Sequence, residues 1–176
     1  MREKLTRERL ISLMRELART GPRRGAHQVY LVGGGTAVYL GWRPSSIDVD
    51  LHSDQEVVFR DIQQIKERLN INIEFARPED FVPALCGSAD RHVFIDTMGK
   101  ITFYHYDPYA QVFSKVVRGF ERDLDDAGQF VGSGMVEPER FRSLVSAVPD
   151  SAYARYPSLT RSGVEMAVDT FLAGLR

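Results

Sequence analysis

Two carboxylates are the residues of this 176-residue sequence whose type and spacing point most directly to chemistry. Asp48 and Asp50 stand in the alternation Ile47-Asp48-Val49-Asp50-Leu51, which is typical of a strand with both acids on one face. Two acidic side chains on one face repel each other unless a cation neutralises them, and hard oxygen ligands favour Mg²⁺. The pair therefore predicts a magnesium site.

A glycine-rich turn precedes this pair. Gly33, Gly34 and Gly35 stand between an apolar run at 29–32 and a short helical segment at 36–40. Exposed backbone N–H groups at such a turn attract phosphate. A phosphate-binding turn followed by Mg²⁺ carboxylates is the equipment of phosphoryl or nucleotidyl transfer, in which metal ions stabilise the attacking and leaving oxygens. Each signal alone is more often structural, but their order and spacing together favour that chemistry.

The surrounding segments predict the elements that position this motif. A helix is expected over 7–18, because four apolar residues fall on one helical face: Leu10, Leu13, Met14 and Leu17. Strands are expected over 29–32, 47–51 and 71–75. Ser53 and Glu56 form a capping-box pattern, which predicts a helix that opens there and continues to about residue 69.

The second half of the chain is predicted to be mostly helical. Residues 91–96 and 100–106 favour a hairpin around Met98-Gly99. Pro108 begins a long helical region that Gly119 and Gly128 are expected to break or cap, and two further helices are predicted over 138–148 and 161–175. We therefore expect an α+β fold, with an α/β core over 1–106 and a helical bundle over 107–176 as the C-terminal part of the same domain.

The charge, the cysteine count and the hydropathy of the sequence exclude several kinds of protein and site. Basic residues number 23 and acidic residues 24, so the net charge of −1 gives no global basic field for nucleic acid. The single cysteine, Cys86, excludes an internal disulfide and a cysteine-based zinc site. The N-terminal residues lack the apolar stretch of a signal peptide, and no window is long and apolar enough for a transmembrane helix. We expect a cytoplasmic protein without membrane contact.

An aromatic run lies at the start of the long helical region. Tyr104, Tyr106 and Tyr109 fall within six residues, together with His105. Core packing beneath the helix start is the favoured interpretation of this run. A base-stacking platform is the alternative.

The central motif resembles the DNA polymerase beta-like nucleotidyltransferase superfamily, whose signature is a Gly-Gly or Gly-Ser turn, a short helix and a strand with Asp-x-Asp. It is most similar to the bacterial branch related to the AbiEii and MenT toxins. The matching residues are Gly34-Gly35-Thr36-Ala37, Arg43 and Ser46-Ile47-Asp48-Val49-Asp50-Leu51, followed by Lys115 and Arg122-Asp123-Leu124-Asp125-Asp126. The resemblance covers roughly residues 29 to 131 and implies a nucleotidyltransferase-like mixed β-sheet flanked by helices.

The resemblance also implies roles for these residues. Asp48 and Asp50 would hold Mg²⁺, and the triphosphate of an NTP would be lined or neutralised by Gly34, Gly35, Thr36, Ser46 and Arg43. Lys115 and Arg118, at i and i+3 of one helix, would contact phosphate. Asp123 or Asp126 would orient Lys115 or a metal-bound water.

The superfamily pattern places a third carboxylate on a neighbouring strand. Glu74 in Ile73-Glu74-Phe75 is the preferred residue, and Asp96 in Phe94-Ile95-Asp96 is the rival. Two-metal catalysis requires one of them to serve.

The resemblance implies an enzyme that transfers a nucleoside monophosphate from an NTP to an acceptor, with tRNA as the acceptor, in a toxin opposed by an antitoxin protein. Two alternatives remain at this point. One is a non-catalytic module that retains the fold and binds nucleotide or protein. The other is a transferase that modifies a small molecule, as antibiotic nucleotidyltransferases do.

Overall fold

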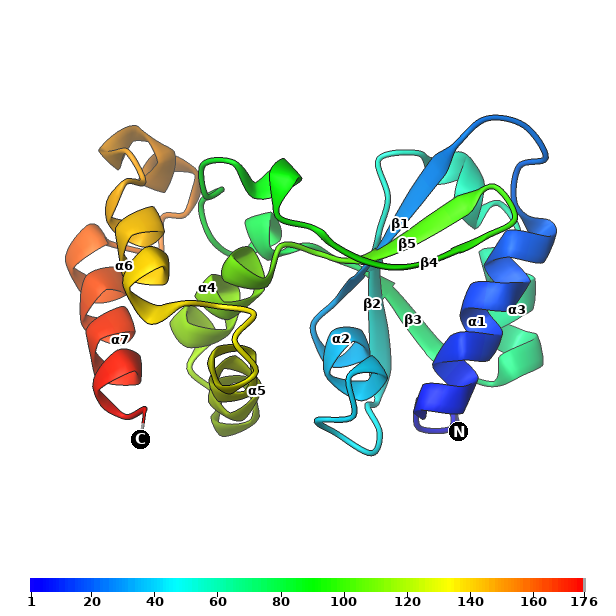
Figure 1. Ribbon diagram of the computed structural model, residues 1–176, viewed down its shortest axis with the longest axis horizontal. Helices are drawn as coiled ribbons and strands as arrows, with labels where there is room; N and C mark the ends of the chain where they lie inside the picture. The colour runs from blue at the N-terminus through cyan, green and yellow to red at the C-terminus, as the bar shows by residue number, and fades with distance from the viewer. Residues whose placement is uncertain (176) are drawn as a thin grey trace. The chain divides into compact units, whose positions relative to one another are not determined.

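The computed structural model describes residues 1–175 and divides the chain into two compact units (Figure 1). The first unit comprises residues 1–77 and 93–106, and the second comprises residues 78–92 together with the chain from 107 onward. The chain passes from the first unit to the second between residues 106 and 107. Residues 78–92, which the sequence placed in the α/β core, group instead with the helices.

The first unit contains a sheet, three helices and one 3-10 turn. Its elements in chain order are α1 (Arg7–Thr20), β1 (His27–Val32), α2 (Gly34–Tyr39), β2 (Asp48–His52), η1 (Glu56–Phe59), α3 (Ile62–Leu69), β3 (Asn72–Phe75), β4 (Val93–Met98) and β5 (Ile101–His105).

The five strands form one mixed sheet in the order β3-β2-β1-β5-β4. Strand β1 is antiparallel to β2 and parallel to β5, β2 is parallel to β3, and β4 and β5 form the expected antiparallel hairpin. The α+β class and the mixed sheet flanked by helices are therefore confirmed.

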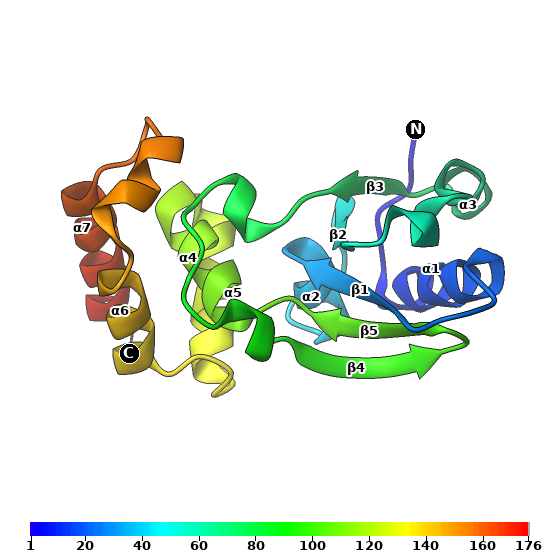
Figure 2. The same cartoon turned by 90° about the horizontal axis from the view of Figure 1, so that it is seen from above.

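The core lies on one face of this sheet. Helices α1 and α3 lie side by side against it (Figures 1 and 2). The expected apolar face of α1 is confirmed, because its four buried residues are Leu10, Leu13, Met14 and Leu17. From the sheet, the same core takes Val29, Leu31, Val49, Leu51, Ile73 and Phe103. Since side chains alternate along a strand, the residues between them belong to the opposite face, called the second face below.

The helix expected from Ser53 to residue 69 is interrupted. The chain forms η1 first, and α3 begins only at Ile62. The hydroxyl of Ser53 donates to the carbonyl of Gln28 at 2.6 Å and accepts from the N–H of Gln55 at 3.1 Å. The capping box is therefore wrong, because this hydroxyl joins a turn to strand β1. The end of α3 at Asn70 is a left-handed cap with φ of 53°.

The second unit is helical. Its elements are η2 (Pro78–Asp80), η3 (Ser88–Asp90), α4 (Pro108–Arg118), α5 (Glu121–Gly132), α6 (Pro138–Ser146), η4 (Asp150–Arg155) and α7 (Arg161–Ala173). Gly119 ends α4 in the left-handed region with φ of 72°, as expected. Gly128 lies inside α5 and ends nothing, so that expectation is wrong.

A buried ion pair ties residues 78–92 to the start of α4. Arg91 Nη2 lies 2.7 Å from Asp107 Oδ2, and the Asp107 side chain is fully buried. The other carboxylate oxygen of Asp107 accepts from the N–H of Tyr109 and caps the helix. This ion pair explains why residues 78–92 belong to the helical unit. No periodic pattern in the sequence predicts the ion pair.

Candidate functional site

The acidic residues of β2 lie on the second face of the sheet. Val49 and Leu51 are fully buried in the core, whereas Asp48 and Asp50 alternate with them and stay partly exposed. In the parallel pair with β3, Asp48 is opposite Asn72 and Asp50 is opposite Glu74. Two neighbouring strands therefore place three carboxylates on one face.

Glu74 is placed better than Asp96 to act with the pair. Glu74 is exposed and is the register partner of Asp50 on the adjacent strand. Asp96 lies on β4, which is separated from β2 by β1 and β5, so three strand spacings of about 4.8 Å each lie between them. The Asp96 carboxylate instead accepts from the N–H of Thr97.

The glycine turn packs directly onto β2. Gly33 has φ of 57°, and a Cβ atom there would lie 2.8 Å from Asp50 Oδ2. A Cβ on Gly34 would lie 2.5 Å from Ser46 Oγ, and one on Gly35 would lie 3.1 Å from a methyl group of Val49. A side chain at either of the first two positions would force the Asp50 carboxylate or the Ser46 hydroxyl to shift, and the positive φ at Gly33 favours glycine there.

Arg43 and Ser46 border the same turn. Arg43 Nη1 lies 3.7 Å from the Cβ position of Gly34. Ser46 is held in place by a two-way backbone bridge, since its N–H donates to the Leu5 carbonyl at 2.9 Å and its carbonyl accepts from Leu5 at 2.7 Å. A guanidinium and a hydroxyl thus lie beside the glycine backbone, which is the donor set that a phosphate requires.

Thr36 does not line this turn with its hydroxyl. The residue is fully buried, and its Oγ1 donates to the Leu31 carbonyl at 3.2 Å and lies 3.1 Å from Nδ1 of His105. The expected phosphate contact is therefore wrong for this side chain, because helix α2 turns it into the core. Burial also lowers the pKa of His105 from 6.5 to about 4, so this imidazole is neutral near pH 7.

The acidic pair fits a divalent cation through its donor chemistry. Mg²⁺ is commonly bound by one or two carboxylates, with waters and substrate phosphates completing its coordination. Within residues 1–175, no three His, Cys, Asp or Glu side chains form a group that could hold a metal ion. The cage of three carboxylates that Asp48, Asp50 and Glu74 were expected to form is therefore not found among these residues.

Asn72 is a site residue that the sequence analysis did not single out. Its Nδ2 donates to Oδ1 of Asp48 across the β2–β3 pair. This bond fixes the orientation of the Asp48 carboxylate. The alternation of residues 71–75 is the signal that places Asn72 beside Glu74 on one face.

Lys115 lies against Asp126 and Asp123, the two carboxylates that were expected to orient it, but it is buried together with them. It is 5% exposed, and its Nζ lies 2.7 Å from Asp126 Oδ2 and 3.5 Å from Asp123 Oδ1, both of which are also buried. Arg118 Nε lies 3.3 Å from the other oxygen of Asp123. The four residues form one ion cluster between α4 and α5, in which the lysine charge is already balanced by carboxylates.

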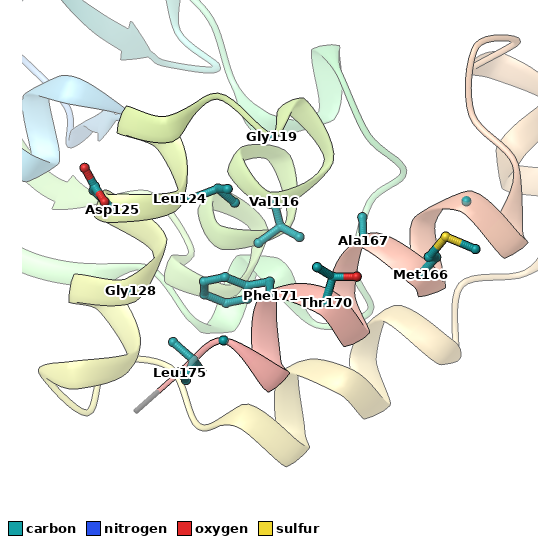
Figure 3. A pocket seen from close by; sticks show the side chains of 12 residues that line it. Val116, Gly119, Leu124, Asp125, Gly128, Met166, Ala167, Thr170, Phe171 and Leu175 are labelled. Atoms are coloured by element: carbon teal, nitrogen blue, oxygen red, sulfur yellow. The ribbon is translucent and has the colours of Figure 1, made fainter.

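An apolar cavity of about 670 Å³ lies in the second unit between α4, α5 and α7 (Figure 3). Val116, Leu124, Met166 and Phe171 contribute much of its apolar lining. The labelled polar side chains at its border are Asp125 and Thr170 (Figure 3). This lining suits apolar packing and provides no set of donors for a phosphate.

Comparison with protein-family models, with curated proteins and with solved structures gave no match. Among the helices of residues 1–175, none is long and apolar enough to cross a membrane.

Proposed function

We propose that the protein is a Mg²⁺-dependent nucleotidyltransferase that moves a nucleoside monophosphate from an NTP to an acceptor and releases pyrophosphate. The observation that carries this proposal is the contact between the two halves of the motif. The Asp50 carboxylate lies against Gly33 of the turn and is in register with Glu74. A phosphate-binding turn and an acidic row therefore meet at one place on the second face.

The chain's own residues supply binding and orientation. The backbone of Gly33 and Gly34, together with the side chains of Arg43 and Ser46, binds the phosphates. Asp48 and Asp50 hold Mg²⁺, and Asn72 orients Asp48. When bound, Mg²⁺ supplies neutralisation of the charge on the phosphate oxygens.

The transfer is an in-line displacement at the α-phosphorus. The acceptor oxygen forms a bond to this phosphorus while the bond from it to the bridging oxygen of pyrophosphate breaks. The proton of the attacking hydroxyl passes to a carboxylate, and Glu74 is placed for this role because it is exposed and adjacent to Asp50. Pyrophosphate then leaves with the negative charge.

The family resemblance supports tRNA as the acceptor and an antitoxin protein as a partner, in a toxin role. The alternatives are a non-catalytic nucleotide- or protein-binding module and a transferase for small molecules. The acidic pair Asp48 and Asp50 favours catalysis over the non-catalytic module, since a module that binds only protein would not need two carboxylates beside a phosphate-binding turn.

The test incubates the full chain with each α-³²P-labelled NTP, Mg²⁺ and either total RNA or total protein. Label is expected in the RNA fraction, and Asp48→Asn is expected to abolish it. Asp96→Asn is the matched control, because it removes an exposed carboxylate from the distant strand β4. Asp48→Asn protein that is folded and labels RNA as fast as wild type would refute the metal assignment.

A further inference from the structure

Four aromatic rings cross the second face of the sheet in one row. They are register partners on four neighbouring strands: His52 on β2, Tyr30 on β1, Tyr104 on β5 and Phe94 on β4. The ring of Tyr30 stacks on His52 at 6.0 Å and on Tyr104 at 5.6 Å, with interplanar angles of 27° and 28°. The ring of Phe94 meets Tyr104 edge-on at 6.2 Å. These four residues are called the aromatic row.

The aromatic row lies beside the proposed reaction centre. His52 follows Asp50 by two residues on the same strand face, a separation of about 7 Å. The ring of Tyr106 adjoins the aromatic row, since it meets both Tyr30 and His52 edge-on at 5.7 and 6.0 Å. Along the strands of the first unit, the acidic residues and the aromatic rings are therefore neighbours on the second face, two residues apart on β2.

The rings of the aromatic row are more exposed to solvent than side chains that only pack in a core. Phe94 is 60% exposed, and Tyr30 and Tyr104 are partly exposed. Cross-strand aromatic pairs stabilise a sheet, but this role does not require a ring with most of its surface in water. The apolar core is already formed by the other face, on which α1 and α3 pack.

The charges beside the aromatic row favour a neutral planar ligand. Asp54 lies 3.1 Å from His52 Nε2, and Asp50 and Glu74 occupy the next level. Carboxylates repel phosphate, so this part of the face would not attract a phosphate group by itself. A planar ring that stacks on aromatic side chains gains contact without a counter-charge.

We propose that the aromatic row is a stacking platform for a nucleobase. This inference rests on the proposed function for its choice of ligand. The base belongs either to the NTP itself or to the end of a single-stranded acceptor. The chemistry is the same in both cases, because every base has a face that stacks on an aromatic ring.

The test compares probes that contain a base with one that does not. The binding of ATP, GTP, CTP, UTP and inorganic tripolyphosphate is measured by calorimetry with Mg²⁺, and that of a single-stranded RNA octamer without nucleotide. Tyr104→Leu and Phe94→Ala should weaken binding of a base-containing probe about tenfold and leave tripolyphosphate unchanged. Tyr104→Phe should bind as wild type does. Phe75→Ala is the control, because Phe75 is 57% exposed but contacts Phe59 on the core side.

The two probe classes identify the source of the base. A loss confined to the NTPs assigns the platform to the nucleotide, and a loss confined to the octamer assigns it to an acceptor strand. If neither class is affected by Tyr104→Leu or Phe94→Ala, the platform is refuted. Failure of tripolyphosphate to bind would instead refute the phosphate site of the proposed function, while the octamer would still test the row. Should Tyr104→Leu not fold, the exposed Phe94 still provides the test.

Discussion

Replacement of Lys115 by methionine should destabilise the second unit. Lys115, Asp126 and Asp123 are 5%, 3% and 7% exposed, so none of the three charges can be solvated by rearrangement at the surface. Methionine fills a similar volume but removes the ammonium group 2.7 Å from Asp126. Breaking a buried pair on one side typically costs 3–5 kcal/mol, because a charge remains in an apolar place. We expect a loss of about 4 kcal/mol in the free energy of unfolding.

Urea denaturation followed by circular dichroism measures this loss. For a chain of this length, about 4 kcal/mol corresponds to a fall in Tm of roughly 10 °C. The double variant Lys115→Met/Asp126→Asn should recover much of the stability, because it removes both charges of the shorter pair. Arg118→Ala is the control. The Arg118 side chain is 44% exposed and its pair with Asp123 is partly solvated, so a loss within about 1 kcal/mol is expected.

The outcome also separates the two roles considered for Lys115. If Lys115→Met unfolds within 1 kcal/mol of wild type but slows transfer about 100-fold, the lysine stabilises charge on the phosphates, as the family resemblance implies. A large loss of stability that the double variant reverses supports the structural ion cluster. In that case Lys115 is a structural residue, and the phosphate contacts would be confined to the glycine turn, Arg43 and Ser46.

Three further predictions concern the first unit and its controls. Asp48→Ala should abolish transfer with stability held or raised, as seen by labelling and by Tm, because repulsion with Asp50 is relieved. Gly34→Ala should weaken NTP binding at least tenfold in calorimetry, since its Cβ would lie 2.5 Å from Ser46 Oγ. Gly128→Ala is the control, because its Cβ would meet open space, and it should add about 0.5–1 kcal/mol to the free energy of unfolding. Stability should fall as the pH drops from 6.5 to about 4, because the unfolded chain protonates His105 before the native state does. His105→Asn should reduce that fall by about 3 kcal/mol in urea titrations, and an unchanged pH profile would contradict the burial argument.

The local periodicity of the sequence predicted much of the first unit. The alternation around Asp48 and Asp50 produced strand β2 with one buried and one polar face, and the apolar stripe of α1 appeared where expected. These features depend on a repeat of two or 3.6 residues, which any sequence displays directly. Such a repeat does not predict the order of the strands in the sheet. The choice between Glu74 and Asp96 therefore needed the sheet, in which β3 and not β4 is the neighbour of β2.

Three polar side chains are more enclosed than their expected roles require. The local sequence predicted a helix cap at Ser53, and the family resemblance implied phosphate contacts for Thr36 and Lys115. Each side chain is instead enclosed and bound within its unit, Lys115 to the Asp126 that the resemblance also named. A polar group that becomes buried must find a partner, and that partner is selected by tertiary contacts. Sequence patterns predict where such a group lies along an element, and they do not predict whether packing will enclose it.

The two faces of strand β2 contribute differently to the stability of the sheet. Val49 and Leu51 are fully buried and stabilise the sheet. On the other face, Asp50 and Glu74 are like charges directly opposite each other, an arrangement that destabilises a strand pair. The same place requires the positive φ of Gly33 against the Asp50 carboxylate. A cation bound at this end of the strand, as the proposed function requires, would reduce the repulsion between Asp50 and Glu74.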